Sequence, residues 1–182
     1  PMEPVNPYGC AKAFVRQLTA VYRAQHKLFA CTGIFYNHES PRRGENFVTR
    51  KICRAAARIK GGEQSELVLG NTNSQRDWGH AKACVRGMWL ALQHDSPDDY
   101  IFATGIPHTV QDVIEVAFDA VGLDWKKFVR QDPQLTRPGE THRPLGDASK
   151  ALRLLGWKPE VTFEQMIREM TLAELATCQQ PT

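Results

Sequence analysis

Tyr8 and Lys12 are the residues near the start of the sequence whose types and spacing suggest chemistry. Two residues four apart on an α-helix lie on one face, one turn from each other. An ammonium placed there can lower the pKa of a phenol, so that the phenol acts as a base near neutral pH. This spacing alone is common in proteins. When no other motif agrees, such a pair is more often a tyrosine beside a solvated lysine than a catalytic pair.

The sequence predicts alternating helices and strands, and these elements must position Tyr8 and Lys12. Apolar periodicity, caps and breakers predict helices over residues 8–26, 47–60, 79–94, 110–121, 149–155 and 163–176. Apolar runs predict strands over residues 28–36, 66–69 and 100–103. We expect loops over residues 37–46 and 70–78, and irregular chain over residues 124–146. This alternation indicates an α/β fold.

The predicted strand over residues 28–36, with the sequence LFACTGIFY, is unusually apolar. Such a strand needs helices on both faces and neighbouring strands on both edges. The remaining sequence offers few strands of that kind. We therefore expect that part of the sheet is supplied by sequence that is absent here.

The composition is that of one globular domain of 182 residues with a formal net charge of +3. The five cysteines are scattered without zinc-ligand spacing, no apolar run reaches membrane-spanning length, and no signal peptide is evident. We expect reduced cysteines, no bound metal, no membrane contact and a cytoplasmic protein. Basic residues between positions 42 and 60 fit a solvated helix face, a site for a phosphorylated ligand or, less well, a nucleic-acid groove.

Several motifs agree with a specific family. The segment Asn6-Pro7-Tyr8-Gly9 with Lys12 resembles the extended short-chain dehydrogenase/reductase superfamily, and residues 35–52, which include NHESPRRGENFVTRK, resemble GDP-mannose 4,6-dehydratases almost letter for letter. Further segments that match in register are Gly70-Asn71, Arg76 to Lys82, Ala103-Thr104-Gly105, Arg137-Pro138-x-Glu140, Leu145-Gly146-Asp147, Ser149-Lys150-Ala151 and Leu155 to Pro159. The resemblance covers nearly the whole chain.

This resemblance implies a Rossmann-like NAD(P)-binding fold, of which the chain holds the C-terminal portion. Residues 1–60 would end the Rossmann-like part, and residues 61–182 would form mostly the substrate-binding subdomain of a single α/β region. The family converts GDP-mannose into GDP-4-keto-6-deoxymannose by an internal redox reaction with NADP. By resemblance, Tyr8 is the catalytic base and Lys12 holds the nicotinamide ribose, while His38 and Arg43 also contact NADP.

The substrate site is implied in the same way. Asn37 follows the apolar strand, where α/β proteins place ligand-contacting loops. Lys51, Arg76 and Arg137 match positions that supply positive charge to the GDP diphosphate. Val48 would lie along the guanine or ribose, and Glu140 would accept hydrogen bonds from ribose hydroxyls.

The sequence lacks the family's Gly-x-x-Gly-x-x-Gly turn, which carries the cofactor pyrophosphate. It also lacks the Ser/Thr and the Glu that precede the tyrosine in the family. We expect the isolated chain to be inactive, to bind NADP weakly at best, and to self-associate or bind a missing N-terminal half. One alternative is a non-catalytic nucleotide-sugar binding or oligomerisation module. Another is a related enzyme for a different nucleotide sugar, but the NHESPRRG loop argues against it because it resembles the mannose enzyme specifically. A nucleic-acid binder is least favoured.

Overall fold

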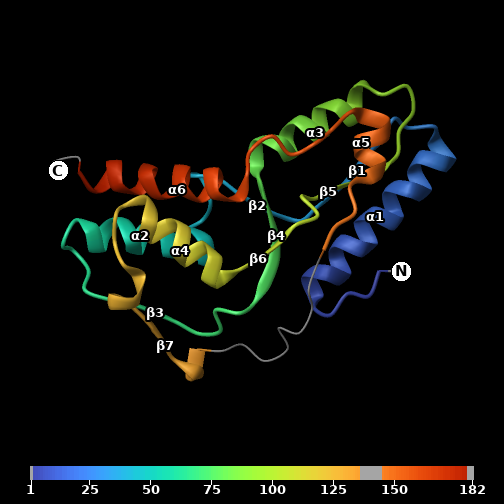
Figure 1. The fold of residues 1–182 in the computed structure, drawn as a ribbon. Helices are drawn as coiled ribbons and strands as arrows, with labels where there is room; N and C mark the ends of the chain where they lie inside the picture. Colours follow the sequence, from blue (N-terminus) through green and yellow to red (C-terminus); the bar gives the residue numbers. More distant parts are fainter. Residues whose placement is uncertain (1, 136–144, 180–182) are drawn as a thin grey trace.

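The computed structural model describes residues 2–135 and 145–179, and three of its helices build the larger hydrophobic core (Figure 1). These helices are α2 (Val48–Lys60), α4 (Val110–Ala120) and α6 (Phe163–Cys178), and each packs against the other two. Side chains with no exposed surface, such as Ile52, Ile114 and Phe118, fill the space between them. We call this helical core, with the short parallel strands β3 (Leu67–Leu69) and β7 (Val129–Gln131) beneath it, the closed half.

Local signals fix the ends of these helices. The Thr109 side chain accepts a hydrogen bond from the Asp112 amide and the Asp112 carboxylate accepts one from the Thr109 amide, which is a capping box at the start of α4. Thr162 and Gln165 form the same arrangement at the start of α6. Helix α2 ends at Gly61, and Gly62 follows with φ of +77°, a conformation that glycine adopts without strain.

A three-stranded sheet lies at the centre of the molecule. Strand β4 (Gln75–His80) runs parallel to β2 (Asn37–Glu39) and antiparallel to β6 (Pro107–Thr109). In Figure 1 the long strand β4 passes between the helices of the closed half and the remaining elements. This sheet therefore joins the two parts of the fold.

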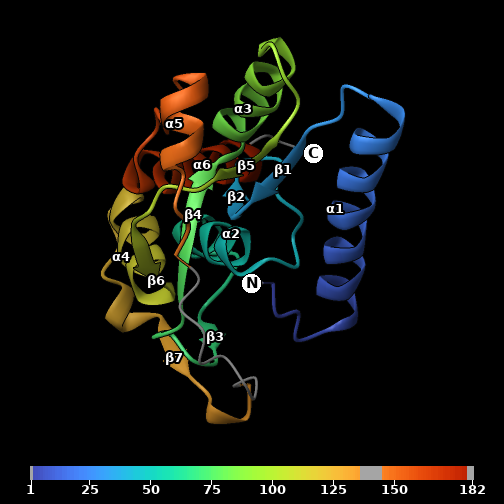
Figure 2. The same cartoon turned by 90° about the vertical axis from the view of Figure 1, so that its right-hand side faces the viewer.

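The second part, which we call the open half, is built on a two-stranded parallel sheet. Strand β1 (Thr32–Phe35) pairs with β5 (Asp99–Phe102), and helices α3 (Ala81–Gln93) and α5 (Ser149–Leu155) contact this pair. The core here is small and centres on Tyr100, Phe102 and Trp157. Helix α1 (Pro7–His26), which completes the open half, stands beside the rest of the molecule (Figure 2).

Charged contacts, rather than buried apolar ones, hold α1 in place. None of its residues is buried. Arg16 and Arg23 both bind the Asp99 carboxylate, at 2.9 and 2.7 Å, and Arg23 Nε also donates to the Ala30 carbonyl at 2.7 Å. The contacts fix the position of α1 and leave its apolar side chains in solvent.

The predicted α/β alternation is confirmed, with differences that have tertiary causes. All six predicted helices are present, but α3 begins at Ala81 rather than at residue 79. Residues 75–80, most of which were predicted as loop, form β4, and β7 lies within the region predicted as irregular. The apolar run over residues 28–36 forms a strand only at Thr32–Phe35. These strands depend on partners distant in sequence, which local patterns do not reveal.

Two further expectations can be compared with the structure. The sequence favours core positions for the tryptophans Trp78, Trp89, Trp125 and Trp157. Trp78 and Trp157 lie in the core and Trp125 packs against it partly buried, but Trp89 is 60% exposed, so the prediction for Trp89 is wrong. Among the described residues, no helix combines the length and apolar character needed to cross a membrane.

Candidate functional site

A cavity of about 510 Å³ opens between the first turn of α2, the end of β3 and the strand β4. Three residues of the predicted substrate site, Val48, Lys51 and Arg76, line it together. Its other lining residues are Asn46, Phe47, Leu69, Gly70, Asn71, Ser74, Trp78, Val110 and Leu135. The volume is in the range of pockets that bind small organic ligands.

The elements bring these side chains together from distant parts of the sequence. Val48 and Lys51 are three residues apart in the first turn of α2 and therefore face the same side. Arg76 comes from β4, where its Nη1 donates to the Gln75 carbonyl at 2.6 Å. Lys51 Nζ lies 3.4 Å from the Val68 carbonyl oxygen at the surface. The two cationic side chains thus meet at one cavity although they are separated by 25 positions.

The lining combines three kinds of group. Lys51 and Arg76 supply positive charge, the side chains of Asn46 and Asn71 supply amide donors and acceptors, and Trp78 and other apolar side chains supply a flat wall. Helix α2 begins at this cavity without a side-chain cap, so its first amides add positive potential. The arrangement suits an anionic ligand that carries an apolar or aromatic group.

Asn46, Asn71 and Trp78 are lining residues that the sequence interpretation did not select. Asn71 was part of a matched motif, and Trp78 was read as a core residue. Asn71 Oδ1 accepts a hydrogen bond from the Asn73 amide at 2.9 Å, which holds the turn before β4. For Asn71 a signal was available, because it lies two positions after the predicted strand over residues 66–69, where ligand-contacting residues gather.

The loop after β2 is held by a buried carboxylate. Glu39 is 1% exposed, accepts a hydrogen bond from Thr49 Oγ1 at 2.6 Å, and lies 3.2 Å from Arg43 Nε. Burial raises the pKa of Glu39, and the Thr49 hydroxyl and the charges of Arg43 and His38 offset only part of that effect. Glu39 therefore holds the loop through contacts with the Thr49 and Arg43 side chains.

Arg43, predicted to contact NADP, belongs to this loop network. Its guanidinium carbon lies 3.4 Å from the centre of the Phe47 ring. Its carbonyl accepts a hydrogen bond of 2.5 Å from Arg50, which also binds Glu174 at 2.6 Å. Arg50 therefore links the loop to α6. It is not simply part of a solvated helix face, which was one interpretation of the basic residues between positions 42 and 60.

The other predicted cofactor residues lie outside the cavity lining. Tyr8 is 72% exposed at the start of α1, and Lys12 Nζ lies 5.4 Å from the centre of its ring. His38 lies in β2, with Nδ1 3.0 Å from the Tyr36 carbonyl oxygen. Asn37, the first residue of β2, faces Trp78 across the sheet. The structure brings the three substrate residues together, but it does not add Tyr8, Lys12, Asn37, His38 or Arg43 to their cavity.

Arg137 and Glu140 lie outside the described residues. Leu135, the last described residue before that gap, lines the cavity. In the described ranges, no group of three His, Cys, Asp or Glu side chains could hold a metal ion.

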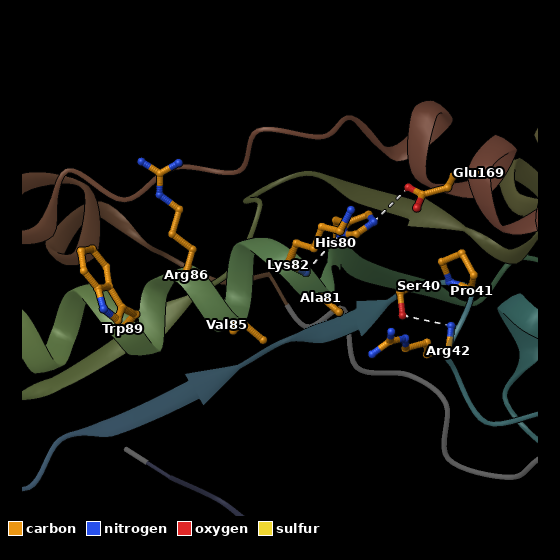
Figure 3. Close-up of a pocket in the computed structure, with 10 residues that line it drawn as sticks. All are labelled: Ser40, Pro41, Arg42, His80, Ala81, Lys82, Val85, Arg86, Trp89 and Glu169. Carbon is orange, nitrogen blue, oxygen red and sulfur yellow. Dashed lines mark hydrogen bonds and ion pairs between the residues drawn. The ribbon is translucent and has the colours of Figure 1, made fainter.

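A second, larger groove of about 940 Å³ runs along α3 between the loop after β2 and helix α6 (Figure 3). His80 is buried at its base: Nδ1 accepts from the Lys82 amide at 3.1 Å, so Nε2 carries the proton and donates to Glu169, also at 3.1 Å. Val85 and Trp89 form its apolar wall. The sequence interpretation selected neither this groove nor the His80–Glu169 pair.

The sequence matches the family model described as GDP-mannose 4,6 dehydratase over residues 1–170. GDP-mannose 4,6 dehydratase 2 of Arabidopsis thaliana is 50% identical over 175 residues, which make up 96% of this chain and 47% of that protein. The GDP-mannose 4,6-dehydratase of Yersinia enterocolitica is 42% identical over 207 residues, which cover 99% of this chain and 56% of that protein. The chain spans about half the length of these curated relatives.

Solved structures show the same fold at lower identity. RMD from Pseudomonas aeruginosa complexed with NADPH matches with a TM-score of 0.88 and 24% identity, over 96% of this chain and 58% of that one. UDP-glucose 4-epimerase from Thermotoga maritima with UDP-glucose matches with a TM-score of 0.81 and 23% identity, over 97% of this chain and 56% of that one. The fold described above is therefore the fold of about half of each of these proteins.

Proposed function

We propose that this chain, which belongs to the GDP-mannose 4,6 dehydratase family, is the C-terminal, substrate-binding half of a GDP-mannose 4,6-dehydratase. The chain matches its curated relatives along nearly its whole length but spans only about half of theirs. In this proposal the reaction is the conversion of GDP-mannose to GDP-4-keto-6-deoxymannose, and this chain is inactive alone.

The observation that carries the proposal is the meeting of Lys51, Arg76 and Val48 at one cavity. A diphosphate placed between the two cations would accept charge-assisted hydrogen bonds from both. The apolar wall beside Val48 would then receive the guanine or the ribose. We assign Arg137 to the diphosphate, Glu140 to the ribose hydroxyls and Asn37 to the sugar-diphosphate side of the same ligand.

The cofactor part of the proposal rests on fewer contacts. NADP, when bound, would take up the hydride from the sugar and return it. The described residues fit part of such a site: the Tyr8 phenol and the Lys12 ammonium share one exposed face of α1, and His38 and Arg43 lie at and after β2. Tyr8 would take a proton from a sugar hydroxyl, while Arg43 would act from the position in which Glu39 and Phe47 hold it. The sequence has no Gly-x-x-Gly-x-x-Gly segment for the pyrophosphate, so we propose at most weak NADP binding by this chain alone.

A second candidate function is a nucleotide-sugar binding module without catalysis. It is favoured by the place of the cavity, which is lined by described residues of the closed half and central sheet and involves neither Tyr8 nor Lys12. Binding could then occur in a chain that performs no reaction.

Calorimetric titration of the 182-residue chain with GDP and with GDP-mannose, each with and without NADP, tests both functions. We expect GDP to bind and Lys51→Gln to weaken binding by at least about tenfold, because a hydrogen bond to a charged group contributes about 1.5–3 kcal/mol. Lys60→Gln, at the exposed end of the same helix, is the matched control and should leave the affinity unchanged.

The outcomes separate the possibilities. Absence of GDP binding, or an equal loss in both variants, contradicts the assignment of the cavity. Turnover of GDP-mannose by the chain alone contradicts the proposal that it is an incomplete enzyme. Binding that persists without turnover, when the rest of a family member is also supplied, favours the module.

A further inference from the structure

The first turn of α2 begins without a side-chain cap. Phe47, the residue before the helix, makes no capping hydrogen bond, and the first helical hydrogen bond runs from the Lys51 amide to the Phe47 carbonyl at 2.9 Å. An uncapped helix end frays, because its first amides have no partners within the helix. Val48 and Lys51, which present this turn to the 510 Å³ cavity, therefore need another contact to hold them in place.

A buried side-chain contact joins this turn to β2. Thr49, the second residue of α2, is 1% exposed, and its Oγ1 donates to Glu39 Oε2 at 2.6 Å. Glu39 is the last residue of β2 and is equally buried. The same Oε2 atom lies 3.2 Å from Arg43 Nε, and the Arg43 guanidinium carbon lies 3.4 Å from the centre of the Phe47 ring. The start of α2 is thus tied to the sheet through Thr49 and to the loop through Phe47.

The sheet to which Thr49 is tied also carries the second cation of the cavity. Arg76 lies on β4, which pairs with β2 along its whole length. The contact between Glu39 and Thr49 therefore fixes the position of Lys51, on α2, relative to Arg76, on the sheet. Neither Glu39 nor Thr49 is among the described residues that line the cavity. Any effect of this pair on a ligand there must act through the lining residues.

We propose that Glu39 and Thr49 are positioning residues for the nucleotide cavity: their hydrogen bond takes the place of a helix cap and holds the turn that presents Val48 and Lys51 to the ligand. This inference rests on the proposed function in taking the ligand to be GDP or a GDP-sugar. A turn that is ordered before binding need not be ordered during binding, so the contact raises affinity by preorganisation. A contact that only stabilised the fold would leave the affinity of the folded chain unchanged.

Amide hydrogen exchange of the 182-residue chain, measured by NMR, tests the turn without a ligand. Thr49→Val keeps the size of the side chain and removes its hydroxyl, whereas the matched variant Thr49→Ser keeps the hydroxyl. We expect the Lys51 amide to exchange at least about tenfold faster in Thr49→Val and within about twofold of the unaltered rate in Thr49→Ser. The Ile59 amide, near the end of the same helix, should change little in both.

Two results of this measurement overturn the proposal. One is equal acceleration of the Lys51 and Ile59 amides, or no acceleration of either, in Thr49→Val. The other is found in the unaltered chain, so it holds even where Thr49→Val does not fold. There the Lys51 amide should exchange at least about 100-fold more slowly than in an unfolded chain, and exchange near the unfolded rate means that the turn frays.

Calorimetric titration with GDP tests the consequence for binding. Thr49→Val should weaken binding by about fivefold and Thr49→Ser by less than about twofold. In a chain that already carries Lys51→Gln, Thr49→Val should cost less than about twofold more, because it acts through Lys51. An unchanged affinity in folded Thr49→Val, or equal losses with and without Lys51→Gln, overturns the proposal. If the unaltered chain does not bind GDP, the proposed function fails, and the exchange of the Lys51 amide alone decides whether Glu39 and Thr49 hold the turn.

Discussion

The closed half and the open half of this molecule differ in how completely they bury their own apolar surface. In the closed half, α2 and α4 leave no large apolar side chain of their own exposed, and α6 exposes Leu172 alone among the described residues. In the open half, α1 has no buried residue and exposes Phe14, Val15 and Leu18, and α3 exposes Trp89. The closed half therefore buries nearly all of its apolar surface, whereas the open half leaves much of its own in solvent.

The candidate ligand cavity and the proposed proton-transfer residues also lie in different parts of the molecule. The cavity with Lys51 and Arg76 lies on the closed half and the central sheet, beside the larger hydrophobic core. Tyr8 and Lys12 lie on α1, the least buried helix of the open half. The ligand cavity is thus formed by described residues of this chain, whereas Tyr8, the proposed proton-transfer residue, is exposed to solvent.

The largest expected effect tests how much the buried core of the closed half contributes to stability. Phe118, which has no exposed surface, packs in the core between α2, α4 and α6. Phe118→Ala should lower the free energy of unfolding by about 3–5 kcal/mol, because it leaves a cavity in a packed core. Leu172→Ala, on the exposed face of α6, should change it by about 0.5 kcal/mol or less. Urea denaturation followed by circular dichroism measures both, and similar losses would remove the distinction between core and surface.

The sequence predicted the helices well because their signals are local. Thr109 with Asp112 and Gly61-Gly62 mark helix ends through contacts within a few residues. Strands β2, β4, β6 and β7 were missed because each pairs with a strand 30 or more positions away in the sequence. The same dependence explains Trp89: its residue type favours a buried position, but the described residues leave 60% of it exposed.

The candidate site was predictable in part for the same reason. Lys51 and Val48 share a helical turn, so their common face follows from spacing. Their meeting with Arg76 requires the position of β4, which spacing does not give. The Glu39–Arg43 pair has opposite charges four positions apart, a signal that was available, but Thr49 and Arg50 join it only through the packing of α2.

The next effect concerns the junction of the two halves. Asp77, fully buried in β4, accepts hydrogen bonds from the Thr104 amide and hydroxyl and from the Gly105 amide, which follow β5. Asp77→Ala should cost about 2–4 kcal/mol, because it leaves buried donors unpaired. Asp77→Asn, which retains an acceptor of the same shape, should cost less. Thermal unfolding of the two variants checks this order, and equal losses would mean that shape rather than hydrogen bonding joins the halves.

A smaller and local effect is expected where α1 contacts the rest of the open half. Asp99 binds both Arg16 and Arg23, so Asp99→Asn should loosen α1 while changing global stability by only about 1 kcal/mol. Limited trypsin digestion should then cut within residues 12–27 several-fold faster. The neighbouring variant Asp98→Asn, which removes a contact with Lys150 instead, is the control. Equal digestion of the two variants would show that α1 is held by other contacts.

The smallest effect is a difference in pH dependence between the two halves. Burial raises the pKa of Glu39, with Thr49 and Arg43 offsetting part of the effect, so the folded state binds this proton more tightly than the unfolded state. Stability due to Glu39 should therefore fall as the pH rises above its ordinary pKa of 4.5. Asp99 behaves oppositely: burial raises its pKa, but the hydrogen bond and charge of Arg23 and the charge of Arg16 outweigh burial, so the pKa is lowered.

The contribution of Asp99 is complete above its ordinary pKa of 3.8 and is lost as the pH falls through its lower folded value. Acid should consequently release α1 in the pH range where the protonated form of Glu39 best fits its buried position beside α2. Urea unfolding between pH 4 and pH 7 should show that Glu39→Gln flattens the decline, since the amide cannot ionise and still accepts from Thr49. Glu164→Gln, on the exposed first turn of α6, should leave the decline unchanged. If the Glu39→Gln curve runs parallel to that of the unaltered chain, the buried carboxylate does not set this slope.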